Sequence, residues 1–71
     1  MNFGEIFKKC RLEMNLSQKA VATKLGVHQS NISDWENNVS RPEYEKLIQL
    51  SAIYDVSLYE LLGIDEFKSE K

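Results

Sequence analysis

The sequence predicts an all-α fold, a single compact domain of five short helices. Apolar residues recur three and four positions apart in five separate segments, which is the spacing of one helix face. Glycine, asparagine and proline stand between these segments, where they favour helix ends and turns. No segment alternates apolar and polar residues as a half-buried strand does. Because 71 residues leave room for one core, we expect one domain over residues 1–64 and a polar tail over 65–71.

The first expected helix ends near Asn15, a residue type that tolerates a left-handed backbone. Its apolar stripe consists of Phe3, Phe7, Cys10 and Met14. The second expected helix begins after Ser17, a favourable N-cap, and ends at Gly26 after about eight residues. Its inward-facing residues are expected to be Val21, Ala22 and Leu25.

The third expected helix runs from Gln29 to about Glu36, after a short turn over residues 26–28. Ile32 and Trp35 fall on one side of it and predict its buried edge. The polar residues that fall roughly opposite are Ser30, Ser33, Asp34 and Asn37.

The fourth helix is expected over about 43–54, with Pro42 near its first turn. Its core side carries Leu47, Leu50 and Ile53. The fifth opens with Ser57 and Glu60 in the spacing of a capping box and stops at Gly63. Its core residues are expected to be Leu58, Leu61 and Leu62.

The second and third segments together have the layout of a helix-turn-helix, in which the second helix enters the major groove of DNA. Periodicity alone fits any small helical bundle equally well. The residues decide between the two, because LSQKAVATKLGVHQSNISDWENNVSRP (residues 16–42) closely resembles the core motif of the Cro/CI-type, or XRE-type, regulators. The similarity extends upstream to Phe3 and downstream to Leu62 without a gap.

This resemblance implies a lambda-repressor-like domain that binds double-stranded DNA, as a homodimer on a palindromic operator, and acts as a transcriptional repressor. Gln18 matches the family residue that bonds a phosphate and supports a base-reading side chain, and Gln29 matches that reader, often of adenine. Other groove-facing positions are Ser30, Asn31, Ser33 and Asp34, and candidate phosphate contacts are Lys19, Lys24 and Arg41. Each of these residues could instead be a solvated surface side chain.

Arg11 and Glu36 match a family pair that ties the first helix to the end of the recognition helix. Three positions depart from the family pattern. His28 stands where Ser or Thr usually caps the recognition helix, so we expect a weaker cap or a phosphate contact in its place. Asp34 places a negative charge near the groove. Asn38 replaces a usual left-handed Gly, so we expect Asn38→Gly to be stabilising.

Charge is the weakest support for DNA binding, because the formal net charge is −2 and nucleic-acid domains are usually basic. Residues 1–42 carry six basic and four acidic groups, whereas residues 43–71 carry three basic and seven acidic groups. A polyanion should therefore meet the first half, with modest and salt-dependent affinity. The acidic second half keeps an alternative open, a protein-interaction module such as the antitoxin of a toxin–antitoxin pair.

Other function classes find little support in the sequence. One His and one Cys give no metal-binding spacing, and no catalytic motif is present, so we expect neither an enzyme nor a cofactor. RNA binding is not favoured, because we expect no exposed aromatic side chains on which bases could stack. The absence of a long apolar run predicts a cytoplasmic protein, and the lone Cys10 is expected to fill core space. Homodimerisation is expected through Tyr59, Ile64 and Phe67, although these residues could instead cover the edge of the core. A protein partner such as an anti-repressor remains open.

Overall fold

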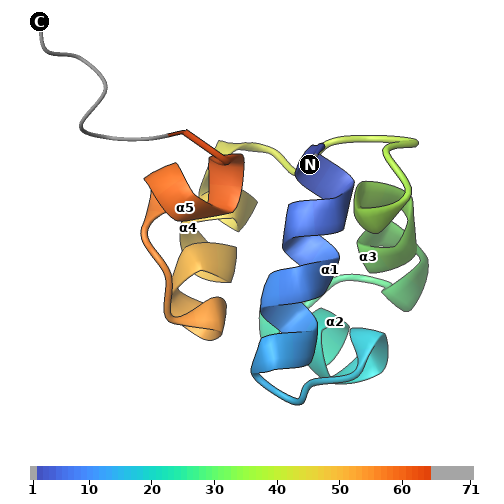
Figure 1. The fold of residues 1–71 in the computed structure, drawn as a ribbon. Helices are drawn as coiled ribbons and strands as arrows, with labels where there is room; N and C mark the ends of the chain where they lie inside the picture. Colours follow the sequence, from blue (N-terminus) through green and yellow to red (C-terminus); the bar gives the residue numbers. More distant parts are fainter. Residues whose placement is uncertain (1, 65–71) are drawn as a thin grey trace, which may run out of the picture.

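A computed structural model describes residues 2–64, and over these residues the chain forms five helices and no strand (Figure 1). The helices are α1 (Phe3–Glu13), α2 (Gln18–Leu25), α3 (Gln29–Glu36), α4 (Tyr44–Tyr54) and α5 (Leu58–Leu62). The all-α, five-helix prediction is confirmed. The tail predicted at 65–71 lies outside the described residues.

Helix α1 runs through the middle of the domain, with α3 on one side and α5 on the other (Figure 1). Helix α2 packs against both α3 and α4, which closes the arrangement around one core. Every helix contributes to that core, which is made of Phe7, Cys10, Val21, Ala22, Leu25, Ile32, Trp35, Leu50, Tyr54 and Leu61. No helix within residues 2–64 combines the length and the apolar character needed to span a membrane.

The helix ends largely follow the residue types that predicted them. Ser17 Oγ accepts from the Ala20 N–H, and Ser57 and Glu60 form the expected capping box. Gly26 and Gly63 have φ of 74° and 73°, the left-handed backbone that ends a helix readily at glycine. Asn15, at φ 58°, is also left-handed as expected.

Two expectations about packing were wrong. Met14 is 41% exposed, because α1 ends at Glu13 and the side chain lies beyond the packed turns. Leu58 is 37% exposed at the first position of α5, whereas Leu61, one turn later, is fully buried. Pro42 lies directly before the N-cap Glu43, near the start of α4 as expected.

The start of α1 is tied to Asn38, which lies just after the end of α3. Asn38 is left-handed, with φ 61°, and its side chain accepts from the Gly4 N–H at 3.1 Å and donates to Asn2 Oδ1 at 3.0 Å. A Cβ on Gly4 would overlap the Glu36 carbonyl oxygen, so glycine allows this close approach. These contacts argue against a stabilising effect of Asn38→Gly, because glycine would lose both bonds.

Candidate nucleic-acid interface

Two helix N-termini offer free backbone donors. At the start of α2, Ser17 accepts hydrogen bonds from the N–H of Ala20 with its hydroxyl and from the N–H of Val21 with its carbonyl. The N–H groups of Gln18 and Lys19 have no partner among residues 2–64. At the start of α3, the N–H groups of Gln29 and Ser30 are likewise unbonded within the described part of the chain. Free N–H groups and the helix dipole together favour an anion at such ends.

His28 occupies the N-cap of α3 with an extended backbone, φ −75° and ψ 147°, and makes no side-chain cap bond. The expected weakness of this cap is therefore present. The Asn31 N–H donates to the His28 carbonyl at 3.0 Å, and the imidazole remains exposed. Helix α3 thus begins with fewer local bonds than α2, where the Ser17 side chain accepts from a backbone N–H.

The polar residues of α3 differ in how much of each side chain is free. Gln29 and Ser30 are exposed at the start of the helix, whereas Asn31, Ser33 and Asp34 are half-buried. Ser33 Oγ also accepts from Asn37 Nδ2 at 3.3 Å. Gln29 and Ser30 are therefore the side chains of α3 with the most freedom to meet a ligand.

A buried ion pair joins α1 to the end of α3. Arg11 Nε lies 2.6 Å from Glu36 Oε2 and Arg11 Nη2 lies 3.1 Å from Glu36 Oε1, so the contact is bidentate. The two side chains are only 9% and 3% exposed. Burying two charges is costly unless their hydrogen bonds are satisfied. Here Arg11 Nη1 also donates to the Leu16 carbonyl at 2.9 Å, and no buried side-chain polar atom within residues 2–64 lacks a partner.

The hydrogen bond to Glu36 raises the pKa of the Arg11 guanidinium above its ordinary value, which keeps it charged in the core. The pair expected between Arg11 and Glu36 is thus present. Arg11 holds three segments together. It lies on α1, pairs with Glu36 of α3 and donates to the Leu16 carbonyl in the turn before α2.

Gln18 has a partner that the sequence did not indicate. Its Nε2 donates to Glu36 Oε1 at 3.0 Å, so the amide joins the ion pair rather than Gln29. No hydrogen bond links Gln18 to Gln29 within residues 2–64. Eighteen positions separate Gln18 from Glu36, and no motif spacing signals the contact.

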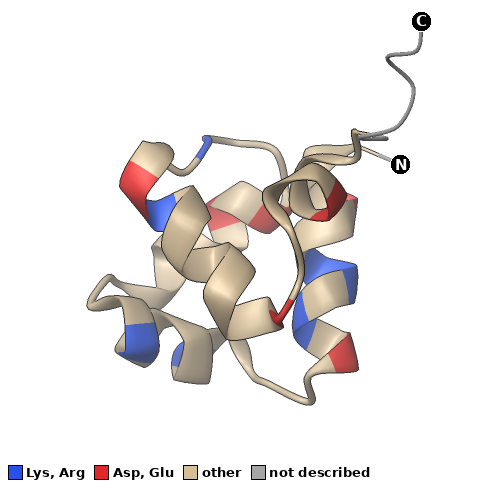
Figure 2. Cartoon of the chain, turned by 90° about the vertical axis from the view of Figure 1, so that its left-hand side faces the viewer, with Lys and Arg blue, Asp and Glu red and all other residues tan. Residues whose placement is uncertain are grey.

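The candidate cationic residues are not equally free. Lys19 and Lys24 are exposed on α2, whereas the Arg41 guanidinium stacks on the Phe3 ring, 4.4 Å from its centroid. Basic and acidic residues lie on several elements rather than gathering on one face (Figure 2). A phosphate contact from Arg41 would have to coexist with the stacking on Phe3.

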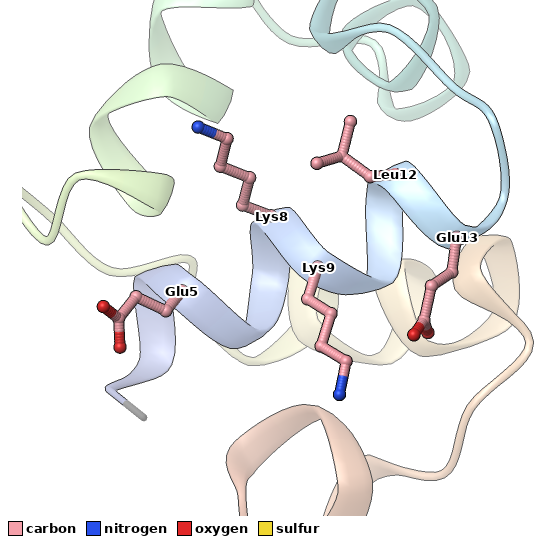
Figure 3. A pocket seen from close by; sticks show the side chains of 5 residues that line it. All are labelled: Glu5, Lys8, Lys9, Leu12 and Glu13. Carbon is pink, nitrogen blue, oxygen red and sulfur yellow. The ribbon is translucent and has the colours of Figure 1, made fainter.

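A second surface feature, a hollow on the outer side of α1, has no chemistry that suggests a site. It is lined by Glu5, Lys8, Lys9, Leu12 and Glu13, all from this one helix (Figure 3). Its two acidic and two basic side chains accompany one exposed leucine, and all five belong to a solvated helix face. Within residues 2–64, no group of three His, Cys, Asp or Glu side chains could hold a metal ion.

Comparison with known proteins agrees with this geometry. A helix-turn-helix family model matches residues 7–61. The transcriptional regulator ImmR of Bacillus subtilis strain 168 is 36% identical over 66 residues, which are 93% of this chain and 52% of ImmR. The chain therefore spans about half the length of this curated relative.

Solved structures resemble the chain over nearly its whole length. The c2 repressor of P22 in complex with a synthetic operator has a TM-score of 0.84 and 31% identity, covering 92% of this chain and 98% of that chain. SinR in complex with DNA has a TM-score of 0.77 and 36% identity, covering 84% and 97%. SinR from Bacillus subtilis in complex with SinI has a TM-score of 0.79 and 31% identity, covering 97% and 67%. This chain belongs to the helix-turn-helix family.

Proposed function

We propose that the chain binds double-stranded DNA at a specific sequence and represses transcription, as a regulator rather than an enzyme. The observation that carries this proposal is the start of α3, where the exposed side chains of Gln29 and Ser30 stand beside two unbonded backbone N–H groups. The similar P22 c2 and SinR structures were solved with an operator and with DNA, which supports the same kind of ligand here. Such a role belongs in the cytoplasm.

In this proposal α3 lies in the major groove and α2 lies against the backbone. Gln29 pairs its amide with N6 and N7 of an adenine, since the glutamine amide matches that donor and acceptor pattern. Gln18, Lys19 and the free N–H groups at the start of α2 contact phosphates. Ser30, Asn31, Ser33 and Asp34 are secondary groove residues, and Lys24 and Arg41 contribute charge at the edge.

Selection of bound duplexes from a random pool, followed by a mobility-shift titration, tests the proposal. We expect an enriched site, and Gln29→Ala should lose ~1–3 kcal/mol of discrimination at one base pair with little change in non-specific binding. Gln49→Ala is the matched control, because Gln49 is an exposed glutamine on α4. Failure to enrich any site, or equal effects of the two substitutions, would reject base reading by α3.

We further propose that the protein acts as a homodimer on a two-fold symmetric operator, whose half-sites would lie roughly 34 Å apart. Tyr59 and Ile64 are 50% and 53% exposed, more apolar surface than the core requires. Phe67 completes the predicted interface but lies outside the described residues. In sedimentation experiments Tyr59→Asp with Phe67→Asp should give a monomer, whereas Tyr44→Asp on α4 should not. A double variant that sediments as a dimer would rule out this interface.

The second candidate function is a protein-interaction module, such as an antitoxin component or the target of an anti-repressor. It is favoured by the acidic second half of the chain, and SinR, which is similar, was solved with SinI. The duplex selection separates the two candidates. An enriched palindrome supports the regulator, whereas no enrichment even at low salt supports the interaction module. Repression itself is tested with a reporter placed behind the selected site.

A further inference from the structure

The Glu36 carboxylate is shared between Arg11 and Gln18. Oε2 accepts from Arg11 Nε at 2.6 Å, and Oε1 accepts both from Arg11 Nη2 at 3.1 Å and from Gln18 Nε2 at 3.0 Å. Arg11 is itself held by the Leu16 carbonyl at 2.9 Å, two residues before Gln18. The chain of bonds therefore runs from the core to the first residue of α2.

This contact fixes which way the Gln18 amide points. An ionised carboxylate only accepts hydrogen bonds, so the NH₂ group of Gln18, and not its oxygen, must face Glu36. One Nε2 hydrogen is then occupied, and the second hydrogen and Oε1 are left without partners among residues 2–64. The free amide hydrogen belongs to the same helix start as the unbonded N–H groups of Gln18 and Lys19.

We infer that Glu36 is a positioning residue for DNA recognition, because its buried carboxylate orients the Gln18 amide so that one N–H is presented to a phosphate. This inference rests on the proposed function. The Glu36 side chain is only 3% exposed and acts through Gln18 without touching the ligand. Gln18 has several rotatable bonds, and holding it in one geometry before binding removes an ordering cost that a free glutamine would pay.

The test needs a variant that removes the carboxylate without leaving Arg11 charged and unpaired in the core. Arg11→Met with Glu36→Leu replaces the whole pair by apolar side chains, an exchange that folded proteins often tolerate. This double variant leaves the net charge unchanged, because it removes one positive and one negative group. Glu36→Gln is the second, more conservative variant, and thermal melting establishes which variants are folded at the assay temperature.

A first readout needs no DNA. In ¹H–¹⁵N spectra the side-chain amide of Gln18 should exchange slowly with water in the wild-type protein and become like the exposed Gln49 in the pair variant. If the wild-type Gln18 amide already behaves like that of Gln49, the carboxylate does not hold it and the inference is overturned.

The second readout is a double-mutant cycle, in which dissociation constants for the selected duplex are measured with and without the ion pair and with and without Gln18. Replacing the ion pair should weaken binding about 2- to 10-fold when Gln18 is present and should have no effect in a Gln18→Ala background. Equal losses in both backgrounds would show that Glu36 only supports the fold, which overturns the inference while leaving DNA binding intact. A wild-type protein that binds no duplex would instead overturn the proposed function, and the positioning role with it.

Discussion

Asn38 and Asn15 are both left-handed, but only one of them uses its side chain to join distant parts of the molecule. Their φ angles are 61° and 58°. Asn38 bonds to Gly4 and Asn2 across the start of α1, whereas Asn15 makes no side-chain hydrogen bond among residues 2–64. Comparing the two sites therefore distinguishes the effect of backbone strain, which both share, from the effect of side-chain hydrogen bonds, which only Asn38 makes.

Replacing each asparagine by glycine should accordingly have opposite effects. Asn15→Gly removes only strain and should be neutral or stabilise by several tenths of a kcal/mol, up to about 1. Asn38→Gly removes the same strain together with two hydrogen bonds, each worth about 0.5–1.5 kcal/mol, and should destabilise by about 1. Chemical denaturation of both variants measures the difference. Equal changes in the free energy of unfolding would mean that the Asn38 bonds contribute nothing.

Residue type alone predicts the backbone at these positions but not the partners. Asparagine before a break in the apolar pattern indicates a left-handed conformation, and the structure has it at both sites. The bond from Asn38 to Asn2 spans 36 positions, and the bond from Gln18 to Glu36 spans 18. Contacts of this kind depend on how helices pack, which no local pattern contains.

Helix ends were predictable because local chemistry sets them. The limits of α2 and α3 follow from Ser17, Gly26 and the periodicity of the segments, and α4 begins within one residue of its expected start. The capping box of Asn2 with Glu5 was not foreseen, although its residues have the right spacing. Depth of burial at helix ends was the least predictable feature, as Met14 and Leu58 show.

Among the first three helices, α1 to α3, the N-terminus of α3 has the weakest cap. Asn2 and Ser17 cap α1 and α2 through their side chains, whereas His28 makes no cap bond. His28→Ser supplies an oxygen that can accept from the free N–H groups and should stabilise by about 1 kcal/mol. The matched control Ser17→Ala should destabilise by a similar amount. Thermal melting measures both, and an unchanged His28→Ser would show that the imidazole contributes an equivalent contact.

Over the whole molecule, charge limits how tightly a polyanion can be held. The net charge is −2, and the exposed lysines of α2 are Lys19, in its first turn, and Lys24, in its last turn. Each lysine that neutralises a phosphate contributes about −0.9 to the slope of log K against log salt. Binding should therefore depend on α2 for its electrostatic part.

Lys19→Gln should weaken binding to all duplexes and reduce the magnitude of the salt slope by about 1. The control is Lys9→Gln, since Lys9 is an exposed lysine on the outer side of α1 (Figure 3). Binding titrations at several salt concentrations give both slopes. If Lys9→Gln changes the slope and Lys19→Gln does not, the polyanion meets α1 rather than α2.

The core also makes stability sensitive to alkaline pH, because it buries a tyrosine hydroxyl and a cysteine thiol, and both groups lose a proton at alkaline pH. Burial raises the pKa of Tyr54 well above its ordinary value of 10.0, and burial together with nearby carboxylates raises the pKa of Cys10 above 9.0. In the unfolded chain both groups lose their protons near those ordinary values, whereas the folded chain keeps them. The unfolded state then binds fewer protons, so the free energy of unfolding falls as pH rises above these values.

Denaturation between neutral pH and pH 11 should therefore show full stability below about pH 8.5 and a progressive loss above it. Tyr54→Phe keeps the ring in the core and removes the ionisable hydroxyl, so it should flatten the alkaline decline even if it changes stability at neutral pH. Tyr44→Phe is the control, because that side chain is 80% exposed, and it should leave the decline unchanged. A decline that is equally steep in Tyr54→Phe and in the wild-type protein would assign the alkaline loss to other groups.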